Sequence, residues 1–311
     1  MRALQSSRWI PVLPWATGAL AAVGFAVALA LGLAPALGRD GVPAGGGAVA
    51  GRGPTHPLLF FDARAFATAE AATAAAPVSP IPEARGLLVP HHWVGGALIT
   101  TPLRDLAASR LVRRVILIGP NHTNAGGAAV LTSDLPWETP FGLTEPDRPA
   151  VAALEAAGVA RLDSEVLTYE HSVAGIVPAV RRYLPEAKVV PLVLRGGLPG
   201  AEIERLAAAL APLVDEGTVL VAAVDFSHGL PAPAARARDG ETLAVLQALE
   251  WAPLLRWGNE HLDSPASVAV LMETMRLLGA AAFELGANSN SGEVSGDLAA
   301  PVTSYFSGYF H

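Results

Sequence analysis

The strongest constraint on the fold is a short apolar run, VILI at residues 115–118, which ends in a Gly-Pro turn and is followed by His122. A run of this length beside a turn signal predicts a buried strand that presents a histidine at its end. The same order of apolar run, turn and histidine recurs at residues 86–92 and 219–228. Because ligands bind beyond the carboxyl ends of strands in open α/β sheets, we predict that these histidines converge on one metal-binding site.

Apolar runs and amphipathic segments alternate through most of the chain, and this pattern predicts the fold class. We predict strands at residues 87–89, 115–118, 128–132, 189–194, 219–224 and 302–306. We predict helices at residues 63–75, 97–110, 147–157, 174–183, 201–214, 239–249 and 265–278. Strands that alternate with helices indicate a single α/β domain with a central, mostly parallel sheet flanked by helices on both faces.

The N-terminal region has a different character from the rest of the chain. Residues 15–37 carry no charge and residues 19–33 are wholly apolar, which is long enough for a transmembrane helix. Arg2 and Arg8 precede this stretch and favour a cytoplasmic N-terminus, with the domain outside the cytoplasm. We therefore predict a single-pass signal anchor within residues 1–37. The alternative is a signal peptide cleaved near Ala34 or Ala36, which would give a secreted protein.

A segment rich in Gly and Pro, residues 38–57, follows the predicted anchor. Such a composition predicts a flexible tether, and we expect His56 within it to be exposed to solvent. The α/β domain is expected to span residues 58–311, opening with a short strand at residues 58–61 and a helix cap at Asp62. A domain of roughly 250 residues can bury a large core, and we find no internal repeat.

Composition and missing motifs exclude several classes of function. The chain has no cysteine, which rules out disulfides, thiolate metal sites and cysteine nucleophiles. A net charge of −7 without a run of basic residues argues against nucleic-acid binding. The sequence contains neither a G-x-S-x-G elbow nor a phosphate-binding glycine motif. Any metal must therefore be held by His, Asp, Glu or backbone oxygens.

Histidines and acids at predicted strand ends and in loops are the candidate functional residues. They are His91, His92, His122, Glu170, His171, Asp225, His228 and Asp263. Neutral imidazoles and carboxylates from separate loops can together hold a divalent ion. Any one of these histidines also fits a hydrogen-bonded loop residue, so the residues alone leave both interpretations open.

Five short motifs occur in a fixed order along the predicted domain. They are VPH at 89–91, GPNH at 119–122, WETPFG at 137–142, EHS at 170–172 and DFSH at 225–228. Together they resemble the MEMO family, also called AmmeMemoRadiSam system protein B. The resemblance covers residues 58–311. It implies the fold of the class III extradiol dioxygenases, a single α/β domain with a metal-site pocket beyond the sheet.

The resemblance also implies a set of metal ligands and acid–base residues. His91 and His122 match the two metal histidines of the family, and Asp263 stands where the family often has a cysteine. Two histidines and one carboxylate suit non-haem Fe(II), with copper or zinc as alternatives. His171 and His228 match positions around the pocket, and we expect them to act as acid–base groups.

The chain departs from the family pattern in two places. His92 and Trp93 stand where the family has small residues, and Val173-Ala174 stands where an acid normally follows the EHS motif. Both changes alter the expected wall of the pocket.

Three functions are consistent with the sequence. The first is a membrane-tethered, metal-dependent oxidoreductase that acts on a small molecule. The second is a non-catalytic module that binds metal or a peptide in the same pocket, with Trp93 and Trp137 as contact surfaces. The third is a tethered domain whose site has decayed.

Overall fold

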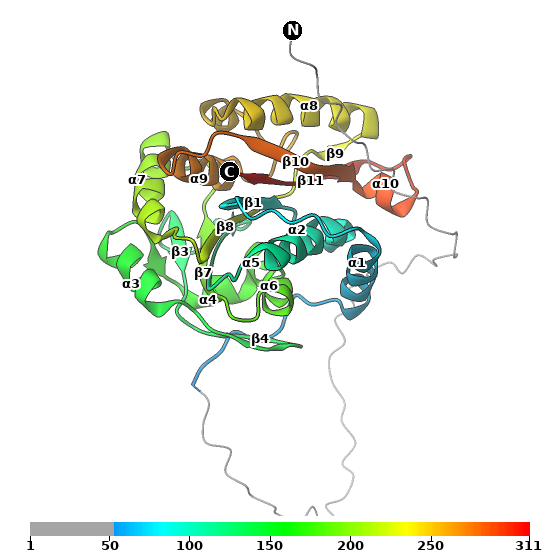
Figure 1. The fold of residues 1–311 in the computed structure, drawn as a ribbon. Coiled ribbons are helices and arrows are strands. Elements are labelled where there is room, and N and C mark those ends of the chain that lie inside the picture. Colours follow the sequence, from blue (N-terminus) through cyan, green and yellow to red (C-terminus); the bar gives the residue numbers. More distant parts are fainter. Residues whose placement is uncertain (1–52) are drawn as a thin grey trace, which may run out of the picture. The chain divides into compact units, whose positions relative to one another are not determined.

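A nine-stranded sheet organises the protein in the computed structural model, which describes residues 53–311. Its strand order is β10-β11-β1-β8-β2-β7-β3-β6, with β9 paired beside β11 (Figure 1). The central four strands are β1 (Gly86–Val89), β8 (Thr218–Ala223), β2 (Arg114–Pro120) and β7 (Lys188–Leu194). These four are mutually parallel, so their carboxyl ends meet at one edge of the sheet.

The outer strands give the sheet its mixed character. They are β3 (Val130–Thr132), β6 (Arg161–Leu162), β9 (His228–Leu230), β10 (Phe283–Asn290) and β11 (Val302–Phe310). β11 runs antiparallel to β1 and β10, and β3 runs antiparallel to β7. The predicted α/β class with a mostly parallel central sheet is confirmed.

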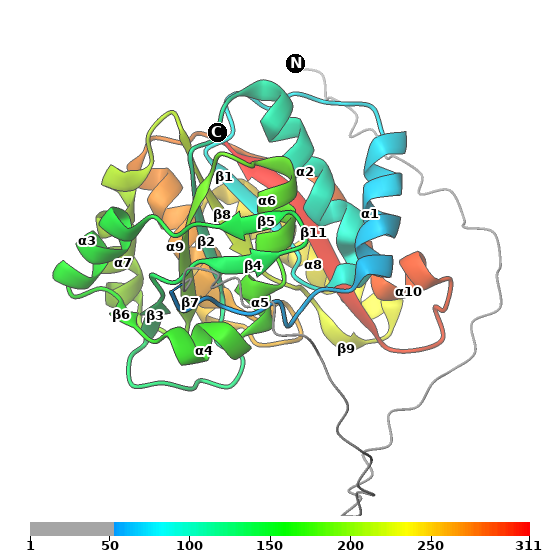
Figure 2. The same ribbon diagram turned by 90° about the horizontal axis from the view of Figure 1, so that it is seen from below.

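Helices cover both faces of the sheet, as predicted. One face carries α3 (Arg148–Ala156), α7 (Gly200–Leu210), α8 (Ala232–Ala248) and α9 (Pro265–Leu277). The other carries α1 (Ala63–Ala75), α2 (Gly96–Ser109), α4 (Ser164–Tyr169), α5 (His171–Ala174) and α6 (Val177–Tyr183). Figure 2 shows the second set beside the central strands. Alternate residues of β2 serve the two cores, because Ile116 and Ile118 join one buried cluster and Val115 and Leu117 join the other.

Helix starts follow the capping residues in the sequence. The Asp62 carboxylate accepts hydrogen bonds from the backbone N–H groups of Arg64 and Ala65, and Ser264 caps α9 by accepting from Ser267 N–H. The helix predicted at residues 174–183 is divided into α5 and α6. Residues 58–61 form no strand, so that prediction is wrong, and they lead into α1 without regular secondary structure.

The expectation that His56 is exposed is also wrong. Its side chain is fully buried and stacks on Trp137, with 3.9 Å between ring centroids. The His56 backbone pairs beside β4 (Trp137–Thr139), which forms a hairpin with β5 (Gly142–Thr144). The end of the predicted tether is therefore packed into the domain.

Several elements were not predicted from the sequence. Besides the β4–β5 hairpin, these are β6, β9, β10, α4 and α10 (Ser291–Ser295). The predicted anchor at residues 1–37 lies outside the residues that the structure describes. Within residues 53–311, no helix combines the length and the apolar character needed to cross a bilayer.

Candidate metal centre

Three neighbouring strands deliver candidate ligands to one edge of the sheet. β1 leads to His91, β8 leads to Asp225 and β2 leads to His122. Since β8 lies between β1 and β2 and all three are parallel, the residues that follow them gather at one place. The convergence predicted for these strand ends is present in the fold.

Asp263 reaches the same place from the loop before α9. The backbone pairs Phe226 with Leu262, and Asp263 N–H donates to the Asp225 carbonyl oxygen over 3.1 Å. Ser264 then caps α9, which fixes where the loop ends and the helix begins. These contacts hold the Asp263 side chain against the strand ends, although 38 positions of sequence separate it from Asp225.

The distances from Asp263 to the two imidazole nitrogens fit a metal site. Asp263 Oδ2 lies 3.4 Å from His91 Nε2 and 3.7 Å from His122 Nε2. Ligand atoms bound to one ion at about 2.1 Å lie roughly 3.0 to 3.7 Å apart when their angle at the ion is between about 90° and 125°. Ligand atoms of His91, Asp225 and Asp263 lie within 4.8 Å of one another, as do those of His91, His122 and His171.

Hydrogen bonding determines which nitrogen of His91 is free to bind an ion. His91 Nδ1 lies 3.2 Å from the Ala223 carbonyl oxygen, and because a carbonyl only accepts, Nδ1 must carry the proton. Burial lowers the pKa of this imidazole to about 4, so the ring is neutral near pH 7. His91 Nε2 and Asp263 Oδ2 are therefore both hydrogen-bond acceptors, and they face each other.

Glu170 orients His122 in the same way. The Glu170 carboxylate lies 2.8 Å from His122 Nδ1 and accepts a second hydrogen bond from the His122 backbone N–H. Burial favours the neutral ring of His122, but the carboxylates of Asp263 and Glu170 outweigh burial and raise its pKa to about 10. Glu170 is itself buried, yet hydrogen bonds from His122 and from Ser172 N–H lower its pKa to about 2.

The Asp263 carboxylate is the least satisfied group in the cluster. Its side chain is 6% exposed, and neither oxygen accepts a hydrogen bond from any residue within 53–311. A buried carboxylate without donors is costly unless a positive charge compensates it. Without an ion the charged ring of His122 supplies this compensation from 3.7 Å, and a cation between Asp263 and the two imidazoles would supply it at shorter range.

Asp225 supports the cluster from behind. Its Oδ1 accepts hydrogen bonds from the backbone N–H groups of His91 and His92, while Oδ2 lies 3.7 Å from His91 Nε2. Burial raises the pKa of this carboxyl, although the bonds from the His91 backbone oppose the shift. The side chain thus fixes the backbone at His91 and leaves one oxygen near the candidate ion position.

The two predicted acid–base residues lie beside this cluster. His171 stacks on His122 with 4.2 Å between ring centroids, and it is about half exposed. Burial and the neighbouring His122 lower the pKa of His171. His228 also lines the pocket, and its Nδ1 atom is buried without a hydrogen-bond partner among the described residues. Four of the five predicted site residues line one pocket, and the fifth, Asp263, lies beside it within 3.7 Å of His91 and His122. Their roles stay predictions.

The pocket around the cluster has a volume of about 590 Å³ and two kinds of wall. The polar part of the lining includes histidines and Asp225, and the apolar part includes Leu59, Phe60, Phe61 and Trp93. Trp137 does not belong to it, because its side chain is 2% exposed and lies against His56. The expectation that Trp137 offers a contact surface is therefore wrong.

Sequence reasoning missed two contributions to this pocket. Residues 59–62 line it, although they precede the first predicted motif. Tyr305 in β11 lies with its hydroxyl 2.8 Å from His92 Nδ1 and holds that imidazole at the pocket wall. Neither contribution carries a recognisable motif, and the pairing of β11 with β1 was not predicted.

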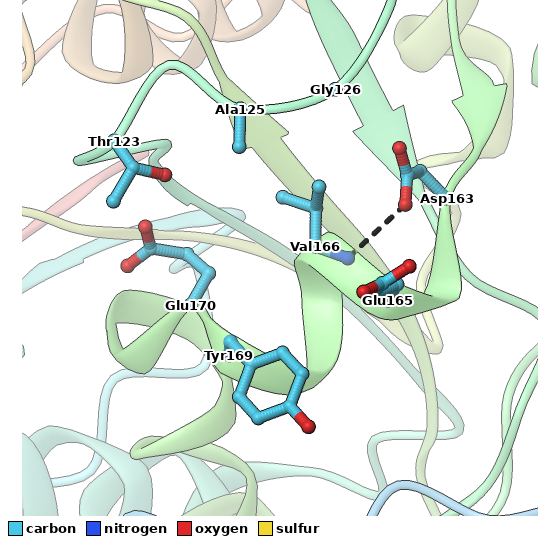
Figure 3. Close-up of a pocket in the computed structure, with 8 residues that line it drawn as sticks. All are labelled: Thr123, Ala125, Gly126, Asp163, Glu165, Val166, Tyr169 and Glu170. Carbon is cyan, nitrogen blue, oxygen red and sulfur yellow. Dashed lines mark hydrogen bonds between the residues drawn. The ribbon is translucent and has the colours of Figure 1, made fainter.

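A second cavity, of about 400 Å³, adjoins the loop that carries His122. Thr123, Ala125, Asp163, Tyr169 and Glu170 are among the residues that line it (Figure 3). Its wall contains no histidine, and the Asp163 carboxylate already accepts a hydrogen bond from the Val166 N–H group. The candidate ligand set therefore belongs to the first pocket.

Comparison with known proteins agrees with this architecture. The fold and the pocket define an α/β protein with a histidine and carboxylate cluster at the carboxyl edge of its sheet. The model of the Memo-like protein family matches residues 64–309, and the chain belongs to this family. The resemblance inferred from the five motifs is confirmed.

Individual relatives are similar over most of their length. A MEMO1 family protein of Methanopyrus kandleri is 28% identical over 226 residues, covering 70% of this chain and 80% of the relative. One of Aeropyrum pernix is 30% identical over 227 residues, with the same coverage of each chain. Among solved structures, an uncharacterised protein of Escherichia coli K12 aligns with a TM-score of 0.49 and 16% identity, covering 71% of this chain and 98% of the other.

Proposed function

We propose that this protein binds a divalent metal ion through His91, His122 and Asp263 and acts as a metal-dependent oxidoreductase. The observation that carries the proposal is the buried Asp263 carboxylate, which has no donor among the described residues and faces two imidazole nitrogens. A cation would relieve the repulsion between the carboxylate and the His91 Nε2 lone pair, and it would displace the Nε2 proton of His122. The donor set of two imidazoles and one carboxylate suits Fe(II) first, with copper or zinc as alternatives.

The surrounding residues fit such an ion. Ala223 and Glu170 accept from the Nδ1–H groups of His91 and His122, which leaves both Nε2 atoms as the available ligands. Acceptors that hydrogen-bond to the Nδ1–H group of a metal-binding histidine orient the ring and raise the basicity of its Nε2 atom. A bound Fe(II) would supply redox and Lewis-acid chemistry toward a small molecule in the pocket.

His171 and His228 are the proposed acid–base residues. Both line the pocket beside the cluster, and an imidazole can accept or donate a proton near neutral pH. His171 is the better placed to meet a substrate, since about half of its side chain is exposed. In this proposal the two histidines move protons to and from the substrate while His91, His122 and Asp263 hold the ion.

Oxygen consumption tests the catalytic part of the proposal. We expect Fe(II)-loaded protein to consume oxygen and cleave the ring of a catechol, and His171→Ala to lower the rate at unchanged metal content. A rate that stays the same in His171→Ala would remove this residue from the mechanism. Full metal occupancy without any turnover of catechols would reject the oxidoreductase assignment and leave metal binding in place.

A non-catalytic binding module is the alternative function. The observation that favours it is the apolar wall of the pocket, where Leu59 and Trp93 offer contact area for a peptide or small molecule. Turnover separates the two proposals, because a binding module would hold the same ligands without converting them.

The proposed function includes attachment to a membrane. The uncharged stretch at residues 15–37 supports a single-pass anchor, and Arg2 and Arg8 support a domain outside the cytoplasm. A reporter that is active only outside the cytoplasm, fused after Ala50, should be active. Activity of a cytoplasmic reporter at the same position would reverse the orientation, and a mature chain that begins after Ala36 would indicate a cleaved signal peptide.

A further inference from the structure

Residues 55–62 form a segment that joins the end of the predicted tether to α1, and we call it the strap. The strap precedes the region that the family model matches, which begins at residue 64. It nevertheless supplies Leu59, Phe60, Phe61 and Asp62 to the wall of the metal pocket. Part of this pocket is therefore built from a segment that lies outside the matched family region.

Both ends of the strap are fixed to the domain. At one end, His56 N–H donates to the Pro136 carbonyl over 2.8 Å, and Glu138 N–H donates to the His56 carbonyl over 2.9 Å. At the other end, Asp62 caps α1. The strap is thus an ordered wall of the pocket.

The middle of the strap presents apolar side chains toward the cluster. The Phe60 ring lies 6.0 Å from the ring of His171, measured between centroids. Leu59 lines the pocket and is 48% exposed, whereas its neighbour Leu58 is 39% exposed but does not line it. Phe61 is packed against Phe66, with 5.3 Å between ring centroids, so it anchors the segment.

From this arrangement we infer that the pocket selects a ligand with an oxyanion head and a flat apolar body, and that the strap supplies the selectivity. The inference rests on the proposed metal site, because the ion would hold the head group. Phe60, Leu59 and Trp93, which line the same pocket, would contact the body. Aromatic and aliphatic side chains contribute binding free energy through apolar contact, whereas they offer nothing to a bare polar head.

Matched ligands and matched variants test this inference in the full-length protein loaded with Fe(II) under anaerobic conditions. Acetate supplies the carboxylate head alone, and phenylacetate and phenol supply a carboxylate and a phenolate head with an aromatic body. Leu59→Ala and Leu58→Ala make the same change at adjacent positions, of which only Leu59 faces the pocket. Calorimetry gives the dissociation constants, and metal analysis gives the occupancy of each variant.

We expect phenylacetate to bind more tightly than acetate, and Phe60→Ala to weaken phenylacetate by roughly threefold to tenfold, in line with the loss of one aromatic contact. Leu59→Ala should weaken it less, and Leu58→Ala should leave it unchanged. Acetate affinity and metal content should stay the same in all three variants. Tighter binding of phenol than phenylacetate would assign a phenolate head, and the reverse order a carboxylate head, and either order supports the inference.

Three results would overturn the inference, and they are distinguishable. If wild-type protein holds metal but Phe60→Ala binds phenylacetate as well as wild type, the strap does not select the ligand and the metal site stands. If wild-type protein takes up no metal, the proposed function fails and the inference fails with it. Equal loss of acetate and phenylacetate in Phe60→Ala would indicate a damaged pocket and would also contradict a role confined to the apolar body.

Discussion

The surroundings of His56 and the cluster of His91, His122 and Asp263 differ in how their hydrogen bonds are completed. His56 has both ring nitrogens satisfied, with Nδ1 2.7 Å from Thr168 Oγ1 and Nε2 2.7 Å from Ser133 Oγ. Since the Thr168 hydroxyl donates to the Ser164 carbonyl, it accepts from His56 Nδ1, and Nε2 accepts from Ser133. The neutral imidazole of His56 thus fits its surroundings without any ligand.

In the cluster of His91, His122 and Asp263, the hydrogen bonding is incomplete. Each imidazole has its Nδ1 proton bound to an acceptor, and both Nε2 atoms face a carboxylate that receives no hydrogen bond from residues 53–311. His56 and His91 are both buried histidines, so burial and residue type do not separate a structural histidine from a candidate ligand. The two kinds of histidine are separated by whether the hydrogen-bond donors and acceptors around the ring are matched.

Removing His122 should have the largest effect on metal binding. Loss of a residue that hydrogen-bonds to a metal-binding histidine lowers metal affinity by roughly 10- to 100-fold. Loss of a direct ligand in His122→Ala should therefore weaken binding by roughly a thousandfold. The apo protein should also lose stability, because His122→Ala leaves the buried Glu170 carboxylate without its charged partner. Metal titration and thermal unfolding measure the two effects. His311→Ala is the control, and equal metal affinity in both variants would contradict the comparison.

His56 should make the protein sensitive to acid. Burial lowers the pKa of His56 to about 4, from 6.5 for an exposed imidazole. Between these values the unfolded chain binds a proton that the folded protein does not, so stability is present above pH 6.5 and falls as the pH drops toward 4. The shift corresponds to roughly 3 kcal/mol. His56→Gln should show a shallower decline of unfolding free energy in urea titrations over this range, and identical slopes would contradict the assignment.

Glu170 should have a smaller effect on the metal than His122. Glu170→Gln keeps an acceptor for His122 Nδ1–H but removes the negative charge, which lowers the basicity of Nε2. We expect metal affinity to fall about tenfold, which is the lower end of the range for residues that hydrogen-bond to a metal ligand. Glu202→Gln, a charge removal on the surface of α7, serves as the control in the same titration. A thousandfold loss in Glu170→Gln would indicate that Glu170 binds the ion itself.

The central part of the fold was predictable because its signals are local. The apolar runs at residues 115–118, 189–194 and 219–224 form β2, β7 and β8, and adjacent parallel strands bring their ends together. The positions of His91 and His122 follow from that arrangement. Asp263 came from motif matching, since the pairing of Phe226 with Leu262 that carries it to the strand ends leaves no periodic pattern in the sequence.

Other parts depend on contacts between distant segments and were missed. β10 reads FELGANSN and lacks an apolar run, because it pairs only with β11 and much of it stays exposed. His56 follows a Gly- and Pro-rich segment, so its composition predicted exposure, whereas stacking on Trp137 buries it. The apolar run at residues 58–61 predicted a strand, whereas the strap at residues 55–62 pairs with the hairpin only at His56. Its place in the pocket follows from the fixed positions of His56 and Asp62.

Metal content of wild-type protein and Asp263→Asn after anaerobic loading with Fe(II) tests the central claim most directly. The substitution preserves shape but removes the charge, and its amide can donate to the imidazole nitrogen that now faces an acceptor. We predict about one ion per wild-type chain, as expected for one cluster of ligands. Asp263→Asn should hold little metal and be at least as stable as the wild-type apo protein. No metal in the wild-type protein, or equal metal content in both, would contradict a metal site built on Asp263.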